Sequence, residues 1–253
     1  APYQYSLNGG AFQASGTFNG LAAGPNTVTV RDALLCTFNV PVTITQPASA
    51  VSGSITSQTN VLCFGSSTGS VTILGSGGVG PDQYSLNGGA YQGSGTFNGL
   101  AAGPHSVTVR DANLCTASVP VTITQPVSAV GGSISSQTNV SCFGGNDGSV
   151  TIAGSGGTPG YQYSLNGGVY QGSGTFSGLA AGPYTVTVRD VNLCTFNVAV
   201  TITQPASGVG GSITSQTNVS CFGGNNGSVT VAGSGGTSPY QYSLNGGAYQ
   251  AAG

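Results

Sequence analysis

The feature that most constrains this chain is an internal repeat with a period of 79 residues. The segment GLAAGPHSVTVRDANLC at 99–115 returns with few changes at 20–36 and at 178–194. The cysteines follow the same period in two series, Cys36, Cys115 and Cys194, then Cys63, Cys142 and Cys221. Self-similarity of this kind indicates one structural unit written several times, and it takes precedence over a domain count based on length.

The repeats are predicted to begin after the recurring segment Val-Thr-Ile-Thr-Gln-Pro. Its last residues, Pro47, Pro126 and Pro205, each end an alternating strand pattern and lead into small residues. The predicted segments are 1–47 (C-terminal part of a repeat), 48–126 and 127–205 (complete repeats), and 206–253 (N-terminal part of a repeat).

The two partial repeats are complementary. APYQYSLNGGAFQASG at 1–16 and SPYQYSLNGGAYQAAG at 238–253 are near duplicates that lie three periods apart. The chain is therefore expected to be a window of a longer array, or a subunit whose ends complete its neighbours.

The hydrophobic pattern of 127–205 predicts short strands separated by glycine-rich turns. Val150 and Ile152 alternate with polar residues, as do Val186 and Val188, which is typical of strands with one buried face. Asn-Gly at 166–167 predicts a hairpin turn. Roughly seven short strands in one repeat predict an all-β chain of tandem immunoglobulin-like β-sandwich domains, with a small barrel as the alternative.

Charge and cysteine content limit the classes of partner. The chain has three Lys plus Arg, five Asp plus Glu and a net charge of −2, so it offers no basic surface to nucleic acid. No apolar run is long enough to span a membrane as a helix. Recurrent cysteines predict an extracellular or cell-surface location. Nearly uncharged copies can approach one another without repulsion, which favours head-to-tail or lateral self-assembly.

The cysteines are predicted to form disulfides inside each repeat. In a sandwich of this kind we expect the turn after the first strand and the turn before the last strand to lie at the same pole. The expected bonds are Cys63–Cys115 and Cys142–Cys194, with Cys36 and Cys221 left to pair across chain ends or with chain neighbours. No Cys-x-x-Cys or Cys/His cluster favours zinc.

Residues suited to catalysis are scarce, so no enzyme activity, cofactor or metal is predicted. His105 replaces Asn26 and Tyr184 of the other copies and is interpreted as an exposed filler. Asp111 is expected to cap its turn by accepting backbone N–H groups. Arg110 is expected to form a solvated pair with that carboxylate or to reach an adjacent repeat.

Tyrosines around the Asn-Gly-Gly turn are the remaining candidates for binding. These candidates for ligand or inter-unit contact are Tyr84, Tyr91, Tyr163 and Tyr170. Core packing is the favoured interpretation, because Tyr163 shares a strand face with Leu165. The alternatives are a row of tyrosines along the array that stacks on sugars, and contact between units.

One combination of residues in the third copy resembles a known family. It consists of Cys142-Phe-Gly144, Gly148-Ser149, Gly156-Gly157, Tyr161-x-Tyr163-Ser164, Leu179-x-x-Gly182-x-Tyr184-x-Val186-x-Val188-x-Asp190, Cys194 and VTITQP at 200–205. The combination, repeated over the whole chain, resembles the SprB-type repeat of large cell-surface adhesins from gliding and related Bacteroidota. Leu35, Leu114 and Leu193 depart from it, since that family usually has Gly before the second cysteine. The resemblance implies export by the type IX pathway, a role in adhesion or gliding motility, and no enzymatic activity.

These observations favour a structural repeat array of a secreted surface adhesin or extracellular filament. The main alternative is a carbohydrate-binding repeat module that uses exposed tyrosines. An ice-binding surface, suggested by the Thr-x-Thr strands, is a more distant one.

Overall fold

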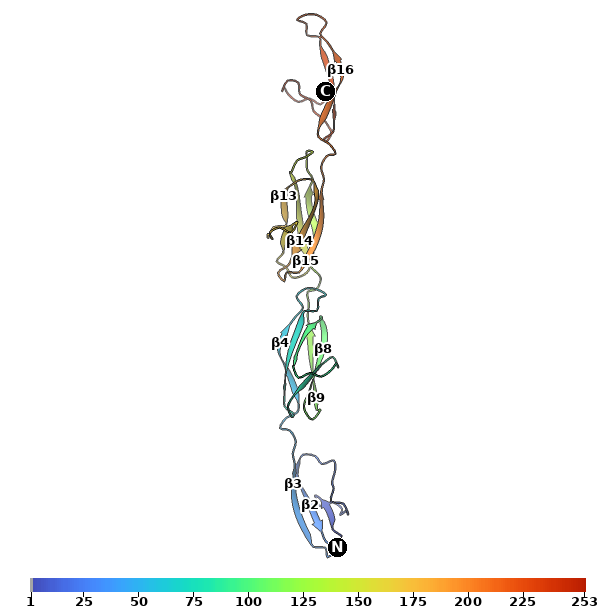
Figure 1. Cartoon of the computed structure of the whole chain (residues 1–253), viewed down its shortest axis with the longest axis vertical. Helices are drawn as coiled ribbons and strands as arrows, with labels where there is room; N and C mark the ends of the chain where they lie inside the picture. The colour runs from blue at the N-terminus through green and yellow to red at the C-terminus, as the bar shows by residue number, and fades with distance from the viewer. Residues whose placement is uncertain (1) are drawn as a thin grey trace. The chain divides into compact units, whose positions relative to one another are not determined.

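The computed structural model describes residues 2–253, and every regular element in that range is a β-strand (Figure 1). The first partial repeat contains β1 (Gln4–Leu7), β2 (Gly24–Arg31) and β3 (Thr37–Ile44). The next repeat contains β4 (Ser52–Thr59), β5 (Gly69–Ser76), β6 (Gln83–Leu86), β7 (Thr96–Leu100), β8 (Gly103–Arg110) and β9 (Thr116–Ile123). Its successor contains β10 (Gly131–Thr138), β11 (Gly148–Ser155), β12 (Gln162–Leu165), β13 (Thr175–Leu179), β14 (Gly182–Arg189) and β15 (Thr195–Ile202). The last partial repeat contains β16 (Gly210–Thr217) and β17 (Ser228–Ser234).

Contacts divide the chain into two compact units. The first is Ala1–Gln58, Ser70–Asn98 and Pro104–Thr122, and the second is Thr59–Gly69, Gly99–Gly103 and Ile123–Gly253. The second unit therefore holds the whole of 127–205 and the loop that carries Cys63. The sequence-based boundaries after residues 47, 126 and 205 stay a prediction.

Residues 127–205 fold as two three-stranded antiparallel sheets. The strand orders are β10-β11-β13 and β12-β14-β15, and β4-β5-β7 and β6-β8-β9 repeat them in the preceding repeat. These are the A-B-E and C-F-G sheets of an immunoglobulin-like sandwich that lacks strand D. The predicted fold class is confirmed, with six strands in each of the repeats 48–126 and 127–205 rather than about seven.

The core of 127–205 lies between the sheets and is built from alternate strand positions. Val150 and Ile152 are buried together with Val186 and Val188. Gly132 on β10 lets the sheets approach closely, because a Cβ there would lie 2.8 Å from Cγ2 of Val188 and 3.1 Å from Cγ2 of Val198. The predicted inward residues therefore form the core.

The Asn-Gly hairpin turn is also confirmed. Asn166 has a φ of 49° and Gly167 a φ of 74°, so both central residues have the positive φ that a type I′ turn requires. Asn and Gly are the residues that accept this conformation at least cost, and the turn fixes the register of the strand that precedes it.

Each partial repeat contains one part of the sandwich. Residues 2–47 form β1-β2-β3, the counterpart of β12-β14-β15, and 206–253 form β16-β17, the counterpart of β10-β11. Val40 is 37% exposed, against 8% for its counterpart Val119. Val229 is 43% exposed, against 1% for its counterpart Val150. These positions are buried where both sheets of a repeat are present.

Candidate functional site

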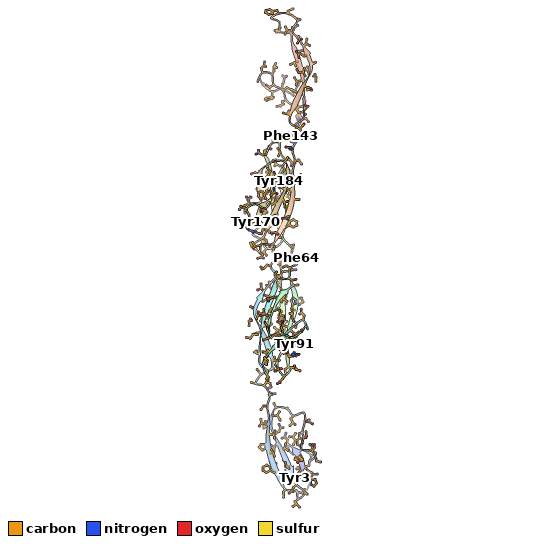
Figure 2. All side chains as sticks on the ribbon, viewed as in Figure 1. Tyr3, Phe64, Tyr91, Phe143, Tyr170 and Tyr184 are labelled. Carbon is orange, nitrogen blue, oxygen red and sulfur yellow. A yellow bond between two sulfur atoms is a disulfide. The ribbon has the colours of Figure 1, made fainter. Side chains whose placement is uncertain are left out.

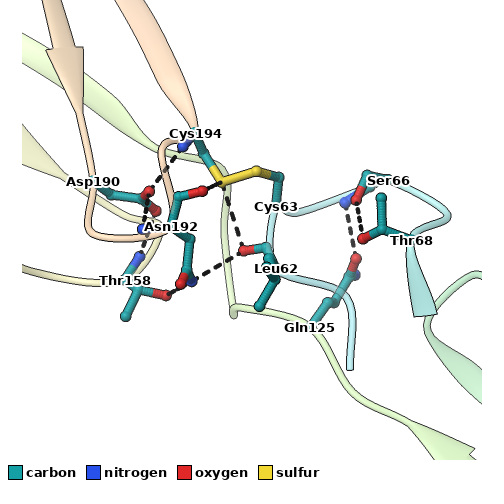
Figure 3. The surroundings of a disulfide bond; sticks show 10 residues. Leu62, Cys63, Ser66, Thr68, Gln125, Thr158, Asp190, Asn192 and Cys194 are labelled. Carbon is teal, nitrogen blue, oxygen red and sulfur yellow. Dashed lines mark hydrogen bonds between the residues drawn. A yellow bond between two sulfur atoms is a disulfide. The ribbon is translucent and has the colours of Figure 1, made fainter. Parts of the chain in front are cut away.

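The described cysteines form one disulfide, between Cys63 and Cys194, whose Cα atoms are 5.6 Å apart (Figure 3). It joins the loop after the first strand of one repeat to the turn before the last strand of the following repeat, 131 residues later. The predicted bonds Cys63–Cys115 and Cys142–Cys194 are therefore wrong. Cys36, Cys115, Cys142 and Cys221 are free and exposed.

The error lies in the pole assigned to the first cysteine loop. The N–H of Val140 donates to the carbonyl oxygen of Thr203 at 2.9 Å, and the N–H of Thr203 donates to Asn139 Oδ1 at 3.1 Å. The loop that carries Cys142 thus lies beside the end of β15, whereas Cys194 precedes its beginning. An eight-residue strand separates the two cysteines by about 25 Å, far beyond the reach of a disulfide.

The end of the preceding repeat holds the Cys63 loop. The N–H of Val61 donates to the carbonyl oxygen of Thr124 at 2.9 Å, and the N–H of Gly65 donates to Gln125 Oε1 at 2.8 Å. Asn60 Oδ1 accepts the N–H of Thr124 at 3.1 Å. These bonds fix the loop on both sides of its cysteine.

The turn before β15 receives this loop. Asp190 is buried; its Oδ1 accepts the N–H groups of Asn192 and Cys194, and its Oδ2 accepts that of Thr158, each at 2.9 Å. The Asn192 amide donates to Thr158 Oγ1 at 2.9 Å and to the carbonyl oxygen of Leu62 at 3.4 Å. The aspartate cap therefore orders the turn, and an amide of the turn contacts the incoming loop (Figure 3).

Asp111, the counterpart of Asp190 one repeat earlier, confirms the predicted cap. It accepts the N–H groups of Val79, Asn113 and Cys115 at 3.0, 3.0 and 2.8 Å. Burial of the carboxyl group acts to raise its pKa, but the three N–H donors outweigh burial, so the pKa of Asp111 lies below its ordinary value.

A second aspartate orders one of the free cysteine loops. Asp147 accepts the hydroxyl and the N–H of Ser141, the residue before Cys142. The hydroxyl donor, followed by the N–H donor, lowers the pKa of Asp147. These hydrogen bonds tie the residue before Cys142 to the far side of its loop.

Arg110 does not pair with the neighbouring carboxylate as expected. Its Cζ lies 3.6 Å from the centre of the Tyr91 ring, and its Nη2 donates to Gln83 Oε1 at 2.6 Å. Arg31 on Phe12 and Arg189 on Tyr170 repeat the stacking at 3.8 and 3.7 Å. The missed signal was an aromatic residue 19 positions before every arginine. The arginines thus cover aromatic faces, including those of Tyr91 and Tyr170. Both tyrosines are labelled in Figure 2.

The other candidate tyrosines lie in the cores. Tyr84 and Tyr163 are buried, and their hydroxyl oxygens accept the N–H groups of Gly75 and Gly154 at 3.0 and 3.1 Å. His105 is half-buried, with Nδ1 3.0 Å from the side-chain amide of Asn87.

Residues 2–253 contain neither a cluster of metal ligands nor a helix suited to crossing a membrane. In that range no three His, Cys, Asp or Glu side chains gather closely enough to hold a metal ion. Nor do those residues form a helix with the length and apolar character needed to cross a membrane.

A family model described as SprB repeat matches residues 55–91, 134–169 and 213–249. The chain carries SprB repeats. Each matched segment contains the first cysteine of its repeat and the Ser-Leu-Asn-Gly-Gly hairpin, so the Cys63 loop belongs to the SprB repeat itself. The SprB repeat is a structural repeat rather than a catalytic domain. No curated protein matches the chain.

Proposed function

We propose that this chain is a structural repeat array of a secreted bacterial surface adhesin or extracellular filament, acting in adhesion, motility or fibre assembly. The observation that carries the proposal is the Cys63–Cys194 bond, which links one 79-residue repeat covalently to the next. SprB repeats typically occur in cell-surface proteins, and a disulfide persists in an oxidising environment outside the cytoplasm.

The disulfide suits a load-bearing role. A pull on the two ends of the chain passes through the sulfur atoms and bypasses the 130 or so residues that the bond encloses. Those residues include the whole of β10 to β14, so the backbone of these strands is not on the covalent path of the pull, which continues from Cys194 into β15. An adhesin or filament subunit built in this way resists extension without a large core in each repeat.

The carbohydrate-binding alternative has less support. Tyr84 and Tyr163 are core residues, and arginine covers one face of Tyr91 and of Tyr170. A sugar would have to displace the guanidinium group before it could stack on that face of either half-buried ring.

Fab fragments raised against the folded chain test the proposed location and role. They are expected to label intact cells of the producing bacterium and to reduce the attachment of those cells to a surface, whereas Fab fragments from pre-immune serum do neither. Labelling that appears only after lysis would contradict the surface location. Surface labelling without any effect on attachment or on filament formation would contradict the role.

A further inference from the structure

One sheet of the repeat 127–205 has an open edge. The strand order of this sheet is β12-β14-β15, so its two edge strands are β12 and β15. The edge of β12 is covered at its middle, because the backbones of Tyr163 and Gln171 exchange two hydrogen bonds of 2.8 and 2.9 Å. Within residues 2–253, β15 pairs with β14 alone. The outer edge of β15 is therefore the side on which this sheet can gain a strand.

The backbone groups of Ala199 on β15 point away from the sheet. Ala199 lies opposite Thr185 of β14. The N–H of Thr185 donates to Asn166 Oδ1 and its carbonyl oxygen accepts the N–H of Asn166, each at 2.8 Å, so neither group is directed at β15. Bonded and non-bonded pairs alternate along an antiparallel ladder, and Asn197 therefore directs its N–H and C=O outward as Ala199 does.

The two ends of the same edge are occupied. The carbonyl oxygen of Thr201 accepts the side-chain amide of Gln137 at 2.8 Å. At the beginning of the strand, Thr195 lines the hollow beside the disulfide. Asn197 and Ala199 lie between these places, and both are exposed. The open part of the edge is thus short and centred on these two residues.

The residue at position 199 distinguishes β15 from its counterparts. β3 has the sequence TFNVPVTI and β15 the sequence TFNVAVTI, so the two strands differ only in that Pro41 is replaced by Ala199. β9 has Pro120 at the same position. Proline has no N–H to donate, and on an edge strand it prevents pairing with another molecule. Two of the three equivalent edges are therefore blocked at their centre, whereas that of β15 is open.

The open edge belongs to the fold of the repeat. β15 lies in a repeat that contains both of its sheets, and β9 ends the corresponding sheet of the preceding repeat in the same way. Residues 195–202 carry no charged side chain. The neighbouring Arg189 is stacked on Tyr170 and donates to Gln162. A neutral strand can therefore approach β15 without meeting an unpaired charge.

We infer that β15 pairs antiparallel with β15 of a second copy of this chain. Asn197 lies opposite Ala199 of the second copy, and Ala199 lies opposite Asn197 of the second copy, about a twofold axis at Val198. Each of these two pairs exchanges two N–H···O bonds, which makes four in all. The two three-stranded sheets then form one sheet of six strands.

A second copy fits this edge for two reasons. The outward N–H and C=O groups of residues 197 and 199 are met by the C=O and N–H groups of 199 and 197, so the edge is its own complement. The chain carries a net charge of −2 over 253 residues, so two copies approach with little repulsion. Pro41 and Pro120 confine the pairing to β15 among the three strands of this kind. The result is a side-by-side contact between two chains.

Sedimentation velocity of the full chain, with its free thiols alkylated, tests the pairing. The wild type is expected to change from a monomer of 24.6 kDa to a dimer of twice that mass as its concentration rises from micromolar to millimolar. Ala199→Pro is expected to raise the dimer Kd by about thirtyfold, because it removes two of the four hydrogen bonds. This variant should fold, since Pro41 and Pro120 occupy the equivalent position. Ala199→Thr keeps the N–H and is the matched control, with the dimer retained.

Hydrogen exchange locates the contact, and a further variant extends it. The amide of Ala199 is expected to exchange more slowly at high protein concentration than at low concentration. The amide of Ser118, the counterpart of Asn197 on β9, should exchange equally at both. Pro120→Ala opens the edge of β9 and should give species larger than a dimer.

Three results would overturn the inference. They are a wild type that stays monomeric throughout the series, an Ala199→Pro variant with the Kd of the wild type, and exchange at Ala199 that does not depend on concentration. The inference goes beyond the proposed surface role and does not depend on it. Fab labelling of intact cells can fail while the dimer forms, and the dimer can be absent while the labelling succeeds.

Discussion

At the scale of single residues, the turn that carries the second cysteine contains an unusual backbone conformation. Leu35, Leu114 and Leu193 each have a φ of 65°, in the left-handed region that costs an L-residue about 1–2 kcal/mol. Leu114 is exposed, so its side chain does not repay this cost through burial. This is the position at which the resemblance to the SprB-type repeat led us to expect glycine.

Leu114→Gly is therefore expected to stabilise the chain. Glycine removes the left-handed penalty, but the larger entropy of the unfolded chain costs about 0.4–1 kcal/mol of stability, which leaves a net gain of up to about 1.6 kcal/mol. Ala112→Gly is the matched control in the same turn, since Ala112 lacks a positive φ and should lose stability. Urea denaturation of both variants measures the difference, and a loss of stability in both would show that the leucine conformation carries no strain.

The Asp111 cap predicts a pH dependence. Because the native pKa lies below the ordinary value of 3.8, the cap contributes its full stability above that pH. The contribution is lost as the pH falls through the native pKa. The melting temperature should fall below about pH 4, and Asp111→Asn should start lower at pH 7 and then fall less steeply. Asp147, with its own lowered pKa, accounts for part of the remaining slope. Equal slopes in the wild type and the variant would contradict the assignment.

At the scale of the element, close approach of the two sheets depends on a small residue on the first strand. Gly132→Ala places a Cβ 2.8 Å from Cγ2 of Val188, and overpacking of this kind typically costs about 1–3 kcal/mol. Gly172→Ala is the control, because a Cβ there meets nothing within 4 Å. Denaturation should separate the two variants by most of that cost. Equal stabilities would mean that the sheets separate without penalty.

The strands and their buried faces were predictable, because alternation in a strand such as Val186–Val188 directly reports which side is buried. The disulfide partner of Cys63 was not predictable. A bond from Cys63 to Cys115 and one from Cys63 to Cys194 join the same two series and differ by one period, so the repeat cannot distinguish them. The choice of partner depends on the position of the first cysteine loop relative to the last strand of its repeat. Hydrogen bonds to Thr203 and Thr124 place that loop beside the C-terminal end of the strand. The arginine–aromatic stacks have a regular sequence spacing and could have been found.

At the scale of the whole molecule, the pairing of cysteines between successive repeats changes what a disulfide stabilises. A bond within a repeat would restrain one sandwich. The observed bond closes a loop with a sequence separation of 131, for which the chain-entropy estimate is about 5 kcal/mol. Unfolding of either linked repeat then takes place within a closed loop, so the bond couples their stabilities.

Removal of this bond is expected to destabilise the chain more than removal of two free cysteines. Cys63→Ser with Cys194→Ser should lower the urea midpoint, whereas Cys115→Ser with Cys142→Ser, measured on monomer with the remaining thiols alkylated, should leave it unchanged. Tryptic digestion of the wild-type monomer without reductant should connect peptides 32–110 and 190–253. A link from 111–189 to either neighbour in the alkylated monomer would restore the bonds within repeats that the structure replaces.

Stretching of a single alkylated chain held at its two ends distinguishes the two arrangements mechanically. With Cys63 bonded to Cys194, unfolding under force cannot extend the enclosed residues, which hold on the order of 450 Å of contour length. A reductant should release that length in one step, because a single disulfide prevents its extension. Bonds within repeats would instead give two steps of roughly 180 Å each, set by the spacing of Cys63 from Cys115 and of Cys142 from Cys194. In the Cys63→Ser and Cys194→Ser double variant the whole length should extend without reductant. A single large step in the wild type and none in the variant would show that tension along the array passes from repeat to repeat through sulfur.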